Sequence, residues 1–211
     1  MNETLFEQEN MTKRVNIIHG WDGHPQDAWI PWLTKELQAR SLEVAAPQMP
    51  HAEMPKLEEW VLALQALQNN VDVNTYFVCH SMGCKSTAKF LESLPDGVMV
   101  GGVVFLAGFF KRLSNLEVDE PGVPETAKKF LEVPIDFEKV RSHIRQSIAI
   151  FSDDDRFVPL DNADDFRDKL GSEIQIIQNM DHFWTKKPDW QEYYRELPIL
   201  LDATLKLTHH A

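Results

Sequence analysis

The chain has 211 residues and a formal net charge of −12, with 43% hydrophobic and 26% charged residues. These fractions are typical of a globular domain and exclude a long disordered or fibrous chain. The negative charge argues against a nucleic-acid partner, because the phosphates would be repelled. No apolar run approaches the 18 residues that a bilayer-crossing helix needs, so we expect no membrane partner.

The first ten residues, MNETLFEQEN, lack the basic start and apolar centre of a secretory signal. We therefore expect a cytoplasmic protein in which residues 1–12 are a disordered extension and residues 13–211 form a single domain. The two cysteines, Cys79 and Cys84, flank a serine and do not have the spacing of a disulfide framework. We expect both to be packed in the core.

Short apolar strands alternate with amphipathic helices along the chain. The pattern predicts strands at 15–19, 42–47, 75–79, 100–108, 147–152 and 173–178. It predicts helices at 29–40, 57–68, 86–94, 160–170 and about 188–207, with shorter ones at 124–132 and 137–144 in a loose segment that leaves room only for a minimal cap. Because each strand is apolar almost throughout, we expect an α/β fold with about six parallel strands covered by helices on both faces.

The segment CHSMG, residues 79–83, follows the third predicted strand and precedes a helix. It matches the nucleophile-elbow pattern GxSxG, except that Cys79 replaces the first glycine. Such a strand-to-helix turn would expose the Ser81 hydroxyl and direct the amide of Met82 at the oxygen where negative charge develops. Ser81 is therefore the candidate nucleophile.

A serine needs an imidazole base, and the imidazole needs a carboxylate to orient it. Asp155 follows the fifth predicted strand and His182 follows the sixth, in the chain order Ser, acid, His that this fold uses. Both lie at carboxyl ends of strands, where reactive groups of a parallel sheet gather. Asp153 and Asp154 stay open as alternatives to Asp155.

The second oxyanion-hole donor should come from the loop after the first strand, where the backbone amide of Trp21 is the candidate. We expect His19 in the same loop to be structural, bonded to the loop backbone. The spacing of His19, His24 and His51 does not suggest a metal site. No cofactor is expected.

Two further groups are given structural interpretations. Trp32 is expected in the core, whereas Trp21 is left open as a possible lining of an acyl pocket. The acidic residues Asp161, Asp164 and Asp165 are expected to form the solvated first turn of a helix, where carboxylates suit the helix dipole.

The segments HGW, WIPWL, CHSMG, DDDRFVP and MDHF occur in this order. With them the chain resembles the small serine hydrolases of the retinoblastoma-binding-protein-nine type, over nearly its whole length from about residue 13. The resemblance implies an α/β-hydrolase without a large lid, with a triad at Ser81, Asp155 and His182. Cys79 departs from the family pattern, and this departure bears on the geometry of the turn.

The sequence thus predicts a carboxylesterase-like serine hydrolase that cleaves small acyl esters, or amides or thioesters, through an acyl-enzyme. Its expected partner is a small-molecule acyl substrate. The alternative is a hydrolase-shaped protein-binding module with weak or no catalytic activity. The natural substrate and the oligomeric state stay open.

Overall fold

The computed structural model describes residues 12–67, 71–116, 123–186 and 192–209. The predicted disordered extension therefore lies almost wholly outside the described residues. Six parallel strands form one sheet in the order β2-β1-β3-β4-β5-β6, which confirms the predicted sheet. The strands are β1 (Arg14–Ile18), β2 (Glu43–Ala45), β3 (Thr75–His80), β4 (Gly102–Leu106), β5 (Ser147–Ser152) and β6 (Glu173–Ile177).

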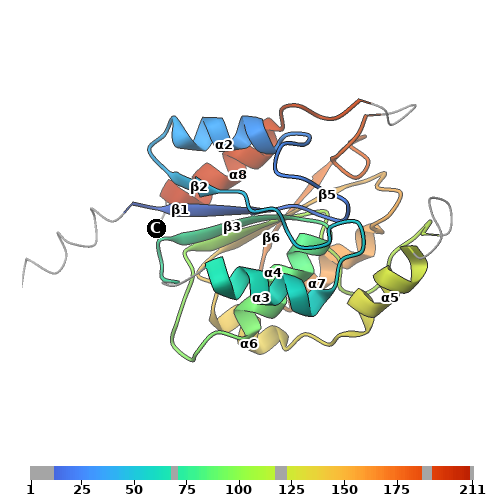
Figure 1. The fold of residues 1–211 in the computed structure, drawn as a ribbon, viewed down its shortest axis with the longest axis horizontal. Helices are drawn as coiled ribbons and strands as arrows, with labels where there is room; N and C mark the ends of the chain where they lie inside the picture. The colour runs from blue at the N-terminus through green and yellow to red at the C-terminus, as the bar shows by residue number, and fades with distance from the viewer. Residues whose placement is uncertain (1–11, 68–70, 117–122, 187–191, 210–211) are drawn as a thin grey trace, which may run out of the picture.

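Helices cover both faces of this sheet (Figure 1). One face carries α2 (Ile30–Gln38) and α8 (Pro198–His209), and the other carries α3 (Leu57–Leu67), α4 (Met82–Glu92), α6 (Phe137–Ser142) and α7 (Ala163–Asp168). A further helix, α5 (Val123–Glu132), follows the loop after β4 and ends against α4, where the buried Lys85 donates a hydrogen bond to the carbonyl of Leu131. None of the described helices is long and apolar enough to cross a membrane.

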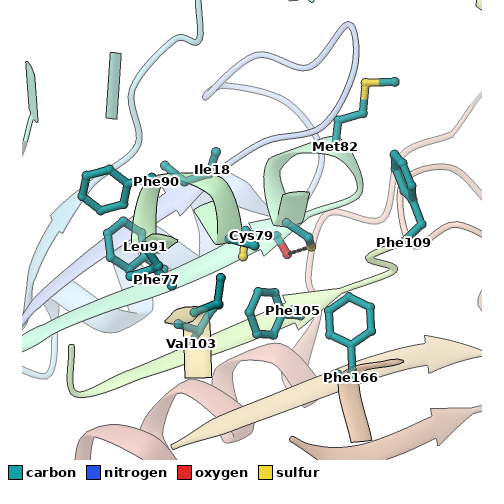
Figure 2. Close-up of a cluster of buried hydrophobic side chains, with 14 of the residues drawn as sticks. Ile18, Phe77, Cys79, Met82, Phe90, Leu91, Val103, Phe105, Phe109 and Phe166 are labelled. Carbon is teal, nitrogen blue, oxygen red and sulfur yellow. Dashed lines mark hydrogen bonds between the residues drawn. The ribbon is translucent and has the colours of Figure 1, made fainter. Parts of the chain in front are cut away.

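Side chains of β3 alternate between two cores, as the two-residue period of a strand requires. Phe77 and Cys79 pack under α3 and α4, whereas Tyr76 and Val78 pack under α2 and α8. Figure 2 shows the first of these clusters, in which Cys79 lies among aromatic and aliphatic side chains. Because both faces are covered, the strand is apolar on both sides, which is why its sequence reads as a continuous buried run.

The last predicted helix begins later than expected. Residues 192–197 are not helical, and Tyr193 forms an isolated antiparallel bridge with Thr185. The helix α8 starts at Pro198, a position where proline is tolerated because the first helical N–H groups have no partner within the helix. The prediction of a helix from about residue 188 was therefore wrong for 192–197, and residues 187–191 lie outside the described part.

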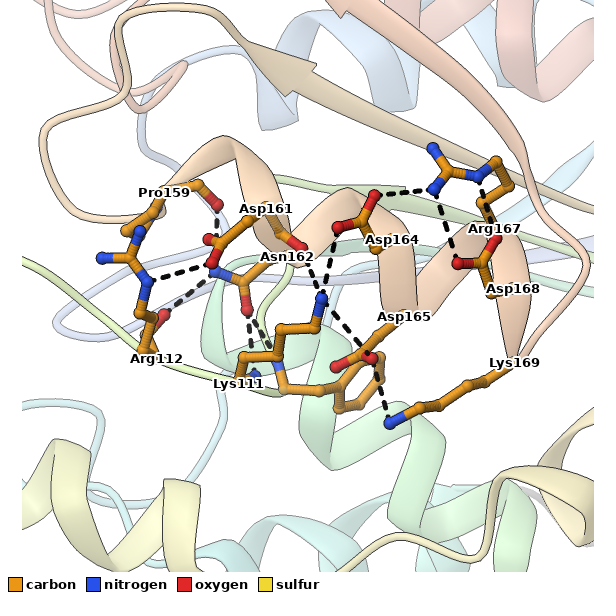
Figure 3. A network of polar contacts seen from close by, with 11 residues as sticks. Lys111, Arg112, Pro159, Asp161, Asn162, Asp164, Asp165, Arg167, Asp168 and Lys169 are labelled. Carbon is orange, nitrogen blue, oxygen red and sulfur yellow. Dashed lines mark hydrogen bonds and ion pairs between the residues drawn. The ribbon is translucent and has the colours of Figure 1, made fainter.

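The predicted helix at 160–170 is a 3₁₀ turn, η1 (Leu160–Asn162), followed by α7. The expectation that all its acidic residues are solvated is wrong for Asp165. This side chain is buried and forms an ion pair with Lys169 at 2.9 Å. Lys111, from the loop after β4, lies 3.4 Å from Asp164 and 3.9 Å from Asp165 (Figure 3). These ion pairs connect α7 to the loop after β4, which is about 50 residues earlier in the sequence.

Asn162 fixes the same loop through its side-chain amide, which uses all of its hydrogen-bonding capacity. Its Oδ1 accepts from the backbone N–H groups of Phe110 and Lys111, both at 3.0 Å. Its Nδ2 donates to the carbonyls of Arg112 and Pro159, again at 3.0 Å (Figure 3). The loop that follows β4 is therefore held by a buried amide rather than by secondary structure.

Candidate active site

Ser81 occupies a sharp turn between the last residue of β3 and the first residue of α4. Its backbone has φ 53° and ψ −119°, a conformation that residues other than glycine seldom adopt. Its N–H donates to the carbonyl of Leu106 in the neighbouring strand at 2.9 Å, which helps to hold the turn. This is the strained strand-to-helix geometry that the CHSMG motif predicts.

Gly83 allows this turn to pack against β1. A Cβ atom at this position would lie 2.6 Å from the carbonyl oxygen of His19 and 2.7 Å from that of Ile18. Both neighbours are backbone atoms, so neither can move aside without shifting the strand end. Glycine is therefore required here by close approach.

Cys79 stands where the elbow pattern has its first glycine, and its side chain is fully buried in the core under α4. The turn at Ser81 forms with cysteine at this position. Cys84, one turn into α4, donates its thiol to the carbonyl of Cys79 at 3.1 Å, and burial raises the pKa of this thiol well above its ordinary value. The Cys84 thiol is thus kept protonated and unreactive.

His182 and Asp155 lie in contact, although 27 residues separate them in the sequence. The Nδ1 atom of His182 is 2.8 Å from Oδ2 of Asp155. The Asp155 side chain is 1% exposed and that of His182 is 13% exposed. The other carboxylate oxygen of Asp155 accepts the N–H groups of Phe157 and Val158, both at 2.9 Å. A carboxylate held in this way fixes the orientation of the imidazole.

The two alternative carboxylates have other partners. Asp153 accepts the backbone N–H of Asn179 at 2.9 Å. Asp154 accepts the Ser152 hydroxyl at 2.7 Å and the N–H of Asp181 at 2.8 Å. These aspartates therefore hold the loop before His182, whereas Asp155 contacts the imidazole itself.

A cavity of about 330 Å³ opens beside the elbow and is bounded by both Ser81 and His182. Its walls are mostly apolar and aromatic, and Asp22 is the one Asp, Glu, Lys or Arg residue among the described residues that line it. The loop held by Asn162 supplies part of the wall. The lining residues are Trp21, Asp22, His80, Ser81, Met82, Phe109, Leu113, Leu116, Phe157, His182 and Trp184.

The two predicted oxyanion-hole residues, Trp21 and Met82, both line this cavity. Met82 is the first residue of α4, where a backbone N–H has no carbonyl partner within the helix. The indole of Trp21 donates to the carbonyl of Glu53 at 3.0 Å, which anchors its loop. Trp32, on α2, was expected in the core, but it is only half-buried and packs against the core rather than within it.

His19 has the structural role that the sequence suggested. Its Nε2 accepts the N–H of Met49 at 3.0 Å, so the proton must lie on Nδ1, which donates to the carbonyl of Gly20 at 2.8 Å. Burial lowers the pKa of this imidazole. His19 thus connects two loops as a neutral ring. In the part of the chain that the structure describes, no three His, Cys, Asp or Glu side chains are grouped so that they could hold a metal ion.

Sequence reasoning missed His80, the residue directly before Ser81. It is buried, it lines the cavity, and its ring centroid lies 4.8 Å from that of His182. The only signal was its place at one of the two variable positions of the CHSMG motif. Its partners His182 and Trp184 lie about 100 residues further along the chain, so sequence spacing could not identify them.

Comparison with known proteins identifies the family of this chain. Residues 15–197 match the profile of the family described as serine hydrolase. The YdeN protein of Bacillus subtilis (strain 168) is 31% identical over 193 residues, which cover 92% of this chain and 95% of YdeN. The serine hydrolase RBBP9 of Rattus norvegicus is 21% identical over 188 residues, which cover 89% of each protein.

Solved structures show the same fold. The crystal structure of the ydeN gene product from B. subtilis has a TM-score of 0.81 and 28% identity, and the match covers 94% of this chain and all of that one. Est1E from Butyrivibrio proteoclasticus has a TM-score of 0.67 and 13% identity, covering 96% of this chain and 91% of its own. The fold is therefore that of the α/β-hydrolases, and the chain belongs to the serine hydrolase family.

Proposed function

We propose that the chain, acting as a single domain over residues 13–211, hydrolyses small carboxylic esters through Ser81, His182 and Asp155. The observation that carries the proposal is the 2.8 Å contact between His182 and the buried Asp155, beside a cavity that Ser81 also lines. The strained turn at Ser81 supports its role as nucleophile, because such strain is concentrated at functional sites. Esterases among the solved structures of the same fold support the choice of esters.

In the proposed reaction, the Ser81 hydroxyl attacks the ester carbonyl while Nε2 of His182 takes its proton. Asp155 accepts a hydrogen bond from Nδ1–H of His182 and stabilises the imidazolium that forms. The backbone N–H groups of Trp21 and Met82 stabilise the oxyanion of the tetrahedral intermediate. The alcohol leaves with the proton from His182, and water then attacks the acyl-enzyme by the same route.

The cavity supports a small, uncharged substrate. Its volume of about 330 Å³ is at the lower end of ligand pockets, and aliphatic and aromatic side chains form most of its wall. An apolar acyl group of a few carbons fits this volume and lining. Among the described lining residues no Lys or Arg is present to bind a carboxylate or phosphate on the substrate.

The test is labelling with a fluorophosphonate probe, with hydrolysis of p-nitrophenyl esters from acetate to octanoate followed in parallel. We expect wild-type protein to be labelled and to prefer the short esters. Ser81→Ala should lose both labelling and turnover, and His182→Ala should lose nearly all of each. The matched control is Ser93→Ala, which removes a serine hydroxyl at the far end of α4 and should change neither.

The alternative, a binding module of hydrolase shape, predicts a different result. A folded wild-type protein that neither reacts with the probe nor cleaves any of the esters would contradict the proposed activity. Labelling that persists in Ser81→Ala would contradict the assignment of the nucleophile while leaving the hydrolase activity intact.

A further inference from the structure

The imidazole of His80 has no role in the reaction described above, although His80 directly precedes Ser81 and its ring centroid lies 4.8 Å from that of His182. His80 is the last residue of β3, and it is 3% exposed. Its ring stacks on Trp184, with centroids 5.2 Å apart and planes 6° from parallel, and Trp29 meets it edge-on at 6.2 Å. Burying a polar ring costs free energy unless its polar atoms are hydrogen-bonded, so the place of His80 calls for an explanation.

The hydrogen bond that His80 makes fixes its tautomer. Its Nε2 lies 2.9 Å from the backbone carbonyl oxygen of His182. Because a carbonyl oxygen can only accept, Nε2 must carry the proton and donate it. The other ring nitrogen, Nδ1, is buried and has no hydrogen-bond partner among the described residues. A second proton on Nδ1 would thus be buried without an acceptor, so the ring is neutral. Burial, followed by the nearby His182, lowers the pKa of His80 well below its ordinary value, which agrees with this state.

The loop that His80 contacts needs such support. Asp181 and Phe183, on either side of His182, both have positive φ values, of 47° and 59°. This conformation is unfavourable for residues with a side chain, so contacts must hold it. Trp29 donates its indole N–H to the carbonyl of Phe183 at 3.0 Å. Two buried ring donors, from His80 and Trp29, therefore bind consecutive carbonyls of the loop that carries His182.

We propose that His80 is a positioning residue for His182: its Nε2–H holds the main chain of the base at a fixed place relative to Ser81. His80 is joined to Ser81 by a peptide bond and to the backbone of His182 by a hydrogen bond. This one residue therefore connects the nucleophile directly to the base. This inference rests on the proposed roles of Ser81 and His182. It explains why a hydrogen-bond donor, rather than an aliphatic side chain, occupies this buried end of β3.

The test compares three variants with wild type. His80→Phe keeps an aromatic ring but removes the donor, and we expect kcat and the rate of fluorophosphonate labelling to fall together by about 10- to 100-fold, with KM within about 2-fold of wild type. His80→Gln restores an N–H at a similar reach and should recover most of the loss. The matched control is His143→Phe, because His143 is also buried with its Nδ1 2.7 Å from a backbone carbonyl, that of Val98, but lies outside the cavity. It should leave kcat unchanged.

Two outcomes would overturn the inference. One is a folded His80→Phe with the kcat of His143→Phe, and the other is a folded His80→Gln that recovers nothing. If Ser81→Ala is inactive while His80→Phe keeps full activity, the positioning role fails and the proposed function stands. Activity retained in Ser81→Ala would instead undermine the proposed function.

A measurement on the wild-type protein avoids any loss of folding in the variants. Nitrogen-15 spectra of the histidine rings, assigned with His80→Gln, should show His80 as the neutral Nε2-protonated tautomer from pH 8 down to pH 5.5. A neutral ring with its proton on Nδ1, or a ring that titrates within this range, would contradict the hydrogen bond on which the inference depends.

Discussion

Asp155 binds His182 with one carboxylate oxygen and its own loop with the other. Oδ2 lies 2.8 Å from Nδ1 of His182, and Oδ1 accepts two backbone N–H groups. The carboxylate therefore cannot turn away from the imidazole without giving up hydrogen bonds that hold it in a buried place. This arrangement links the orientation of the base to the fold of the loop after β5.

The first prediction concerns this pair. Asp155→Asn keeps the shape and the acceptor for the loop, but it turns an NH₂ group toward Nδ1 of His182 and so favours the wrong tautomer. We expect kcat for short esters to fall by about 10³- to 10⁴-fold with little change in melting temperature. Asp153→Asn is the control, since Asn retains an acceptor for the N–H of Asn179. Equal losses in the two variants would contradict the role of Asp155.

The second prediction concerns the elbow. Gly83→Ala places a Cβ within 2.7 Å of two backbone carbonyl oxygens, so β1 or α4 must shift. We expect a loss of about 1–3 kcal/mol in the free energy of unfolding and a fall in kcat, because Ser81 moves with the helix. Gly97→Ala, at a position with positive φ but nothing within 4 Å, should cost about 1 kcal/mol and leave kcat unchanged. Urea unfolding and ester hydrolysis measure both.

The fold, and the gathering of the candidate catalytic residues at one edge of the sheet, could be predicted from local patterns in the sequence. The strands β3, β4 and β5 are short, mostly apolar and fully buried runs, and the candidate residues follow strands whose carboxyl ends meet at one edge of a parallel sheet. The chain order alone therefore placed Asp155 and His182 near Ser81, although it could not separate Asp155 from Asp153 and Asp154.

What the sequence could not show depends on contacts between distant segments. The hydrogen bond from His80 to the His182 carbonyl joins residues 102 apart, and the buried Asp165 lies 3.9 Å from Lys111, which comes from another loop. Residues 192–197 look helical, but the bridge between Tyr193 and Thr185 pairs them with the preceding loop instead. In each case tertiary packing overrides a local preference.

The third prediction concerns the wall of the cavity. Asn162→Ala leaves two backbone N–H groups and two carbonyls without their partner, in a buried place. We expect a loss of about 1–3 kcal/mol in stability and a rise in KM, because the loop with Phe109 and Leu113 loosens. Asp161→Ala removes only an exposed ion pair with Arg112 and should cost less than about 1 kcal/mol. An unchanged KM in Asn162→Ala would show that the loop is held by other contacts.

The fourth prediction concerns pH. Burial lowers the pKa of Lys85 from 10.5 to about 8. Between these two values the unfolded chain keeps a proton that the folded chain has lost, so the stability of the folded state rises with pH across this window. Below about pH 8 the folded state bears the full free-energy cost of burying the charged ammonium. Deprotonation removes this cost as the pH rises, which adds about 3 kcal/mol to the free energy of unfolding by pH 10.5. Lys85→Met has no such group and should lack this rise.

Urea unfolding of both proteins at pH 7.5, 9 and 10 measures the effect. The stability of wild type relative to Lys85→Met should increase steadily along the series, since other titrating groups are common to both proteins. If the free energies of unfolding of the two proteins changed in parallel with pH, Lys85 would not be buried as a charge. Its hydrogen bond to the carbonyl of Leu131 would then be formed in water-accessible surroundings.

The last prediction concerns the charge of the substrate. Asp22 is the single charged Asp, Glu, Lys or Arg side chain among the described residues that line the cavity, and no cation there offsets it. An ester that carries a carboxylate should thus be cleaved less well than a neutral ester of similar length, for example the p-nitrophenyl monoester of succinate against p-nitrophenyl butyrate. Asp22→Asn should narrow this gap in kcat/KM by about 3- to 10-fold, and added salt should narrow it in wild type, since both weaken the repulsion. Asp202→Asn makes the same change of net charge on an exposed residue of α8, outside the cavity. If it narrows the gap equally, the selectivity comes from the overall charge of −12 rather than from Asp22.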